Sequence, residues 1–167
     1  MKLLIHDLEE KTFQSIFPEP MKDVRVISDD GTIKPCIGCF GCWVKTPGQC
    51  ILKDSYSHMG EYLAESDEVI LISRCTYGGF SPFVKNVLDR SISYIHPYFE
   101  IRNGEMHHQH RYDHQYNLKV WFYGDDITEA EKETAKRLVK ANSINMDCTV
   151  KNIAFVREPG SIQGGAL

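Results

Sequence analysis

The sequence has no excess of positive charge, no long apolar run and no internal repeat. Its 19 lysines and arginines are outnumbered by 23 aspartates and glutamates, which leaves a formal net charge of -4 and a pI near 6.0. Because no basic field is available to attract a phosphate backbone, nucleic acid is not an expected partner. No apolar stretch approaches the roughly 20 residues of a membrane-spanning helix, so a membrane partner is not expected either.

A leader segment and structural disulfides are also not expected. The first ten residues, MKLLIHDLEE, hold one lysine and a short apolar run followed by acids, which is typical of neither a signal peptide nor a transit peptide. We therefore expect a cytoplasmic protein, whose six cysteines bind metal, react in redox chemistry or are inert. A length of 167 residues with 42% hydrophobic content predicts one domain over residues 1–167.

Apolar patterns predict an alternation of strands and helices. The first helix must be short, because Pro18 and Pro20 follow it. Ser81 before Pro82 predicts a helix start, and Thr128 with a glutamate three residues later predicts a capping box. Such an alternation is typical of a three-layer α/β sandwich with a parallel sheet, which binds ligands beyond the carboxyl ends of its strands. The predicted strands are 2–6, 23–28, 68–73, 118–124 and 148–156, and the predicted helices are 9–17, 55–66, 81–92 and 127–142.

Residues 92–117 are predicted to form an irregular inserted loop, longer than an ordinary connection. Within it, Asn103-Gly104 favours a hairpin turn. The histidines could bind a divalent metal in pairs only if the segment were helical. We favour a lid or partner-binding segment. The histidines are His96, His107, His108, His110 and His114.

Two loops resemble those of a known family. The segments PCIGCFGCWVKTPGQCILKD and SRCTYGGFSPFVKNVLDRS resemble the flavodoxin-like NAD(P)H-dependent FMN reductases and the related iron-sulfur flavoproteins, over about residues 34–91. The resemblance implies a flavodoxin-like sandwich with a five-stranded parallel sheet, bound FMN, NAD(P)H as electron donor, an unknown electron acceptor and a homodimer. The residues that carry it in the second segment are Tyr77, Gly79, Phe80, Ser81, Lys85, Asp89 and Arg90.

The second of these loops is the expected contact for the flavin ring. Gly78 and Gly79 would let the main chain approach a flat ring and donate N–H groups, and Tyr77 and Phe80 would offer aromatic faces. The alternative is that the two glycines only form a strand-to-helix turn. No general acid or base is expected. The predicted cofactor contacts are Thr76, Tyr77, Gly78, Gly79, Phe80, Tyr123 and Gly124.

The first loop brings four cysteines into fifteen residues. Cys36, Cys39 and Cys42 have Cys-x2-Cys-x2-Cys spacing and Cys50 follows, which resembles the compact motif of iron-sulfur flavoproteins and makes a 4Fe-4S cluster one hypothesis. Zinc is a second, although its usual ligand spacing is two separated pairs. Packing or redox-active thiols are the third and favoured hypothesis.

The sequence departs from the family after the first strand. In relatives a loop rich in glycine and serine holds the FMN phosphate at a helix N-terminus. Here the stretch is HDLEEKTF, in which Asp7, Glu9 and Glu10 would repel a phosphate. One interpretation is an FMN-binding oxidoreductase or electron-transfer protein whose phosphate is held by Lys11, Thr12 or a basic residue of a partner subunit. The other is a degenerate flavodoxin-like binding or assembly module.

Overall fold

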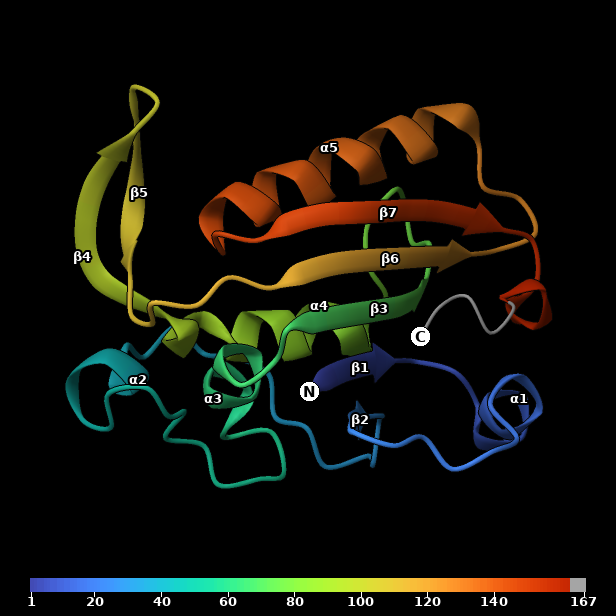
Figure 1. Ribbon diagram of the computed structural model, residues 1–167, viewed down its shortest axis with the longest axis horizontal. Helices are drawn as coiled ribbons and strands as arrows, with labels where there is room; N and C mark the ends of the chain where they lie inside the picture. The colour runs from blue at the N-terminus through green and yellow to red at the C-terminus, as the bar shows by residue number, and fades with distance from the viewer. Residues whose placement is uncertain (163–167) are drawn as a thin grey trace.

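A computed structural model describes residues 1–162 and confirms the flavodoxin-like α/β fold. Five parallel strands form one sheet in the order β2-β1-β3-β6-β7 (Figure 1). No helix within the described residues is long and apolar enough to cross a membrane. The strands of the sheet are β1 (Lys2–His6), β2 (Val24–Ile27), β3 (Glu68–Arg74), β6 (Asn117–Tyr123) and β7 (Thr149–Val156), and the α-helices are α1 (Glu10–Ile16), α2 (Gly41–Val44), α3 (Met59–Ala64), α4 (Pro82–Arg90) and α5 (Glu129–Asn145).

The strand order places a switch point between β1 and β3. The chain moves from β1 outward to β2, and then returns to the other side of β1 to form β3. At such a reversal the connections leave in opposite directions and open a crevice beyond the carboxyl ends of the strands. We call this end of the sheet the carboxyl edge.

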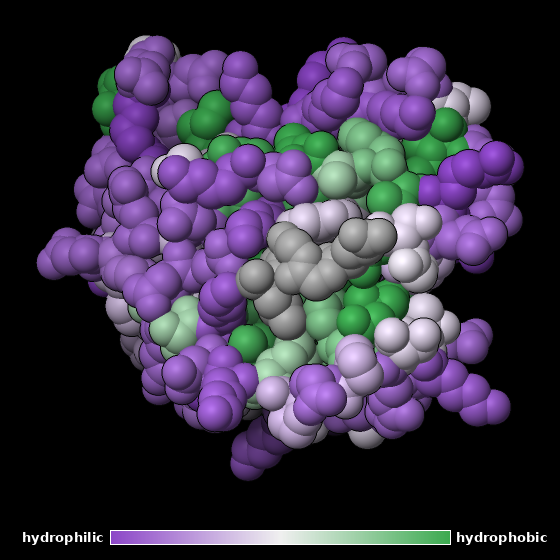
Figure 2. Space-filling view, turned by 45° about the vertical axis from the view of Figure 1, so that its right-hand side comes forward, coloured by the Kyte–Doolittle hydropathy of each residue, from purple (hydrophilic) through white to green (hydrophobic). Residues whose placement is uncertain are grey.

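The sheet is buried on both faces, but unequally. Along each strand alternate side chains enter two different apolar clusters, as in other parallel sheets. The larger cluster lies under α3, α4 and α5 and includes Leu71 and Phe122. The smaller cluster lies under α1, where Phe13 and Phe17 pack on Leu4. On the side that carries α1, apolar side chains are partly exposed among polar residues at the surface (Figure 2).

The prediction of an irregular loop over residues 92–117 is wrong. After a single 3-10 turn, η1 (Ile92–Tyr94), the segment forms an antiparallel hairpin of β4 (Ile95–Arg102) and β5 (Glu105–His110). The predicted turn is confirmed, since Asn103 and Gly104 have φ values of 53° and 83°, as a tight hairpin turn requires. The hairpin stands away from the main sheet (Figure 1).

The helix starts follow their predicted caps. Ser81 accepts the N–H of Val84, and Thr128 forms a full capping box with Glu131. The short first helix is also confirmed, with seven residues. The predicted helix at 55–66 is shorter than expected, since α3 spans only 59–64. After β7 the described chain ends with a 3-10 turn, η2 (Pro159–Ser161).

His6 ends β1 as a buried neutral side chain. Its ring stacks on Phe13 with centroids 4.2 Å apart, and its Nδ1 accepts the N–H of Leu8. Burial lowers the pKa of His6 to about 4. As the pH falls below 6.5, His6 binds a proton in the unfolded chain but stays neutral in the folded chain. The contribution of His6 to the free energy of unfolding is therefore fully present above pH 6.5 and is lost as the pH falls toward 4.

We expect the free energy of unfolding to fall by roughly 3 kcal/mol between pH 6.5 and pH 4 because of His6. Urea unfolding at several pH values measures this slope. His6→Asn keeps an acceptor for the Leu8 N–H and cannot titrate, so it should remove most of the slope. The same change at the half-exposed His58 should leave it. An identical slope in wild type and His6→Asn would contradict the assignment.

Candidate functional site

The predicted ring contact is a closed two-residue turn at the end of β3. Thr76 and Gly79 donate their N–H groups to each other's carbonyl oxygens, both at 2.9 Å. Tyr77 and Gly78 between them have positive φ values of 51° and 74°. We call residues 76–79 the edge turn. It presents the Tyr77 side chain to solvent with 91% of its surface exposed.

Two of the four N–H groups of the edge turn are already used. Those of Thr76 and Gly79 close the turn. A Cβ on Gly78 would lie 2.8 Å from the Thr134 Cβ on α5, whereas one on Gly79 would make only ordinary contacts. Gly78 is therefore required by packing against α5. The open surface for a flat ring is the Tyr77 side chain with the main chain of Gly79.

Three other predicted contacts are placed differently from the expectation. The Phe80 ring is buried in the core and stacks on Phe122 with centroids 5.1 Å apart, so it supports the edge turn from below and offers no face to a ligand. The Tyr123 side chain lies beside Asp7, and the Gly124 N–H bonds to the Val156 carbonyl oxygen. The loop after β6 thus lies beside the edge turn with its polar groups engaged.

Asp7 occupies the switch point. Its carboxylate accepts the main-chain N–H of Arg74, at 2.9 and 3.3 Å to its two oxygens. The side chains of Ser81 and Tyr123 lie beside it. Burial raises the pKa of Asp7, and these polar neighbours oppose the shift. Burial, followed by the neighbouring Asp7, raises the pKa of Tyr123.

The Asp7 network does not fit the FMN phosphate that the fold family implies. It places negative charge where relatives place backbone and hydroxyl donors for an anion. The helix that follows has only seven residues, begins at Glu9 without a side-chain cap and carries Glu10 in its first turn. The loop after β1 therefore does not fit a phosphate.

The cysteine loop, residues 36–50, lies on the opposite side of α4 from α5. Its short helix α2 is fixed by Trp43, whose Nε1 donates to the Ile95 carbonyl oxygen at 2.9 Å. Gly41 is required there, because a Cβ would lie 2.6 Å from the Ile51 side chain. All four thiols line one cavity of about 320 Å³. Cys36 and Cys39 are exposed, Cys42 is buried and Cys50 is partly buried.

The four cysteines are grouped without forming a metal site. Burial raises the pKa of the Cys42 thiol, and the neighbouring Cys50, Cys36 and Cys39 raise it further. No three histidine, cysteine or acidic side chains within residues 1–162 are arranged to hold a metal ion. The structure therefore gives no support to a 4Fe-4S cluster or zinc, and the thiols remain candidates for packing or redox roles.

A buried ion pair ties the cysteine loop to α4. Both guanidinium nitrogens of Arg90 donate to Asp54, at 2.7 and 2.8 Å, and neither side chain is more than 3% exposed. Arg90 also donates to the Lys34 carbonyl oxygen at 2.8 Å and to the Cys50 sulfur at 3.1 Å. The Arg90 hydrogen bonds lower the pKa of Asp54. One guanidinium thus joins both ends of the cysteine loop.

Replacing Arg90 by methionine should cost about 3–5 kcal/mol of unfolding free energy, because Asp54 is left buried without its partner. The double variant Arg90→Met with Asp54→Asn should lose less than the sum of the two single losses. Lys85→Met, which breaks an exposed pair with Asp89 on the same helix, should cost at most about 1 kcal/mol. Denaturant unfolding measures the free energy of unfolding of the three single variants and the double variant. Equal losses from Arg90→Met and Lys85→Met would rule out the anchoring role.

Sequence reasoning missed the partners of Asp7 and Arg90. Asp7 was predicted to repel a phosphate, and Arg90 was part of the motif that carries the resemblance. Their hydrogen bonds join segments that are 67 and 36 residues apart in the chain. The signal that could have found Asp7 is its position directly after the first strand, which brings it to the ends of the neighbouring strands.

Comparisons with known proteins support the resemblance seen in the sequence. No family model matches the chain. An iron-sulfur flavoprotein from Methanocaldococcus jannaschii is 31% identical over 84 residues, a match that covers 50% of this chain and 42% of that protein. The matched segment is therefore less than half of the relative's length. The resemblance to flavodoxin-like reductases and iron-sulfur flavoproteins is confirmed as a similarity of sequence over this segment and a similarity of fold.

Solved structures share the fold across nearly the whole chain. An NADPH-quinone reductase from P. pentosaceus has a TM-score of 0.57 at 12% identity, covering 93% of this chain and 84% of its own. The Trp repressor binding protein from Bacillus subtilis has a TM-score of 0.56 at 11% identity, covering 97% and 90%. An FMN-dependent NADH-azoreductase from Bacillus anthracis, solved with FMN, has a TM-score of 0.51 at 11% identity, covering 99% and 88%. At these identities the likeness shows the fold alone.

Proposed function

We propose that this chain is a flavin-binding redox protein that receives electrons from NAD(P)H, and that it holds the flavin by its ring at the edge turn. The observation that carries the proposal is an exposed tyrosine on a tight turn beside the switch point, followed by an open glycine. The similarity to an iron-sulfur flavoprotein and the fold shared with an FMN-dependent azoreductase support it.

The residues of the edge turn have distinct tasks in this proposal. Tyr77 stacks on the ring, and the absence of a side chain at Gly79 lets the ring approach the main chain. Asp7 fixes the edge turn through the Arg74 N–H and keeps a phosphate out of the loop after β1. A bound flavin supplies the electron-accepting chemistry, since no side chain here is oxidised or reduced in its place.

Exposed apolar residues beside the cysteine loop support the predicted homodimer. Phe40 and Val44 of the loop and Phe99, Ile101 and Met106 of the hairpin are each more than half exposed. Phe40, Val44 and Phe99 line one shallow hollow. A patch of this kind is typical of a protein interface. The electron acceptor and the choice between NADH and NADPH stay open predictions.

A second candidate function is a binding or assembly module without cofactor. The Asp7 network favours it, because the phosphate contact of the fold family is replaced by a carboxylate. The closed edge turn also favours it, since two of its N–H groups bond internally. The two functions differ in one measurable property, the affinity for a flavin.

The variant Gly79→Val tests the ring contact. Its Cβ would lie 3.4 Å from the Thr76 carbonyl oxygen, so the fold should tolerate it, while the valine would block a ring. Titration with FMN, followed by quenching of flavin fluorescence, should show an affinity at least about tenfold weaker, or about 1.4 kcal/mol. Gly160→Val is a matched control at an open position. Unchanged affinity in Gly79→Val, or no flavin binding by wild type, would leave the module as the better function.

Asp7→Asn tests the exclusion of phosphate. Asparagine can still accept the Arg74 N–H but carries no charge, so FMN affinity should rise by about threefold to tenfold through lost repulsion. The gain should shrink at high salt. Glu19→Gln removes an exposed charge elsewhere and should change the affinity little. An FMN affinity that falls in Asp7→Asn would mean that Asp7 assists binding.

A further inference from the structure

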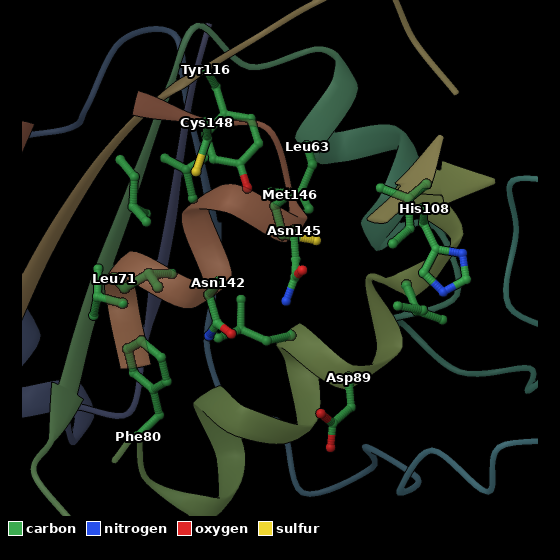
Figure 3. A pocket seen from close by; sticks show the side chains of 16 residues that line it. Leu63, Leu71, Phe80, Asp89, His108, Tyr116, Asn142, Asn145, Met146 and Cys148 are labelled. Carbon is green, nitrogen blue, oxygen red and sulfur yellow. The ribbon is translucent and has the colours of Figure 1, made fainter. Parts of the chain in front are cut away.

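A second enclosed space lies between α4 and α5, above β3 and β6. It has a volume of about 290 Å³ and shares no wall with Asp7 or the exposed Tyr77 (Figure 3). We call it the inter-helix cavity. Only Asp89 and Ile92 also line the cavity of the cysteine loop, so the two spaces lie on opposite sides of the C-terminal end of α4. The flavin proposal assigns no role to the inter-helix cavity.

The inner walls of the cavity are apolar. Leu71 of the sheet and Phe80 before α4 face it (Figure 3). Leu118 of the sheet and Val139 of α5 also line it. An apolar cavity of about 150 Å³ binds one benzene ring. A space of about 290 Å³ is therefore large enough for two fused rings or an apolar body of similar size.

One end of the cavity carries a buried hydroxyl. Tyr116 is 5% exposed, and its hydroxyl points into the space beside the thiol of Cys148 (Figure 3). Burial raises the pKa of Cys148 to about 11 and raises that of Tyr116 well above its ordinary value. Both groups therefore stay neutral, and a thiol is a weak hydrogen-bond partner. This end of the cavity favours a neutral group that can exchange a hydrogen bond with Tyr116.

Polar side chains line the cavity at the C-terminal ends of both helices. Asp89 lies near the end of α4, and Asn142 and Asn145 lie near the end of α5. Asp89 pairs with Lys85, whose side chain does not line the cavity. No lysine or arginine of the described residues lines the cavity, and helix C-terminal ends carry partial negative charge. A carboxylate or phosphate would therefore find no cationic partner there, and the cavity disfavours both.

Asn142 brings an amide to the cavity from the last turn of α5. The buried residues of α5 are Ala135, Val139 and Ser143, and Asn142 is partly buried beside them. Its amide enters the cavity from the side of α5 (Figure 3). An amide at this point can bond to a polar group of a ligand.

We propose that the inter-helix cavity is a binding site for a neutral, flat molecule of about two fused rings that carries one hydroxyl or carbonyl group. The apolar body lies between Leu71 and Val139, and the polar group bonds to Tyr116 or Asn142. The site is separate from the carboxyl edge. A ligand there contacts both α4, which is joined to the cysteine loop, and α5, which covers the edge turn.

Titration with 2-naphthol, naphthalene and 2-naphthoate tests the ligand class. Calorimetry should show saturable binding of 2-naphthol, with naphthalene about fivefold weaker because it lacks the polar group and 2-naphthoate at least tenfold weaker because it is charged. Methyl NMR signals of Val139 and Met146 should shift on addition of 2-naphthol. Failure of 2-naphthol to saturate, or equal affinity for 2-naphthoate, would overturn the proposal whether or not the chain binds a flavin.

Variants that fill the cavity locate the site. Val139→Phe should abolish 2-naphthol binding, and Leu88→Phe, at a partly buried wall position, should do the same if the first variant fails to fold. Asn142→Leu should bring the affinities for 2-naphthol and naphthalene closer together. Val156→Phe, on the opposite face of the sheet, is the matched control and should bind as wild type does. A folded cavity-filled variant with wild-type affinity would place the site elsewhere.

Discussion

The carboxyl group of Asp7 joins the ends of two neighbouring strands, and the properties of the carboxyl edge depend on this contact. Asp7 follows β1 and accepts the N–H of Arg74 at the end of β3, and Tyr123 at the end of β6 lies beside it. In a doubly wound sheet this is the place where ligands bind. A partly buried carboxyl group there stabilises the edge internally and does not fit an anion. In the proposed function, the surface left for a ligand is the uncharged edge turn.

The cysteine loop is likewise held by hydrogen bonds within the chain. Arg90 donates hydrogen bonds to Asp54, to two carbonyl oxygens and to the Cys50 sulfur, so one side chain of α4 holds the loop. The C-terminal end of α4 also borders the inter-helix cavity, so this helix end lies between the two spaces.

Local patterns were sufficient to predict the sheet, its layers and most helix starts. The strands are buried on both faces and therefore read as apolar runs, and Thr128 with Glu131 is a local capping signal. The hairpin was missed apart from its turn, because β5 (EMHHQH) holds a single apolar residue, Met106, and shows no alternation of apolar and polar residues. The length of α3 was overestimated, because Tyr56 continues the helical spacing of Met59 and Leu63 but lies in a turn.

The site could be predicted only in part, because its contacts are long-range. The edge turn was found from its two glycines, yet Phe80 was assigned to the ligand while it packs on Phe122, a residue 42 positions later. The pairing of Arg90 with Asp54, and the lining of one cavity by both Asn142 and Tyr116, depend on how helices lie over the sheet. Spacing along the chain carries no information about such contacts.

The account depends most on the claim that the carboxyl edge holds a flavin by its ring and leaves the phosphate unbound. The dissociation constants of wild-type protein for riboflavin and for FMN, measured side by side at low salt, test it directly. Since the two ligands differ only in the phosphate, the account predicts that riboflavin binds as tightly as FMN or up to about threefold more tightly. FMN binding about tenfold tighter than riboflavin binding would contradict it.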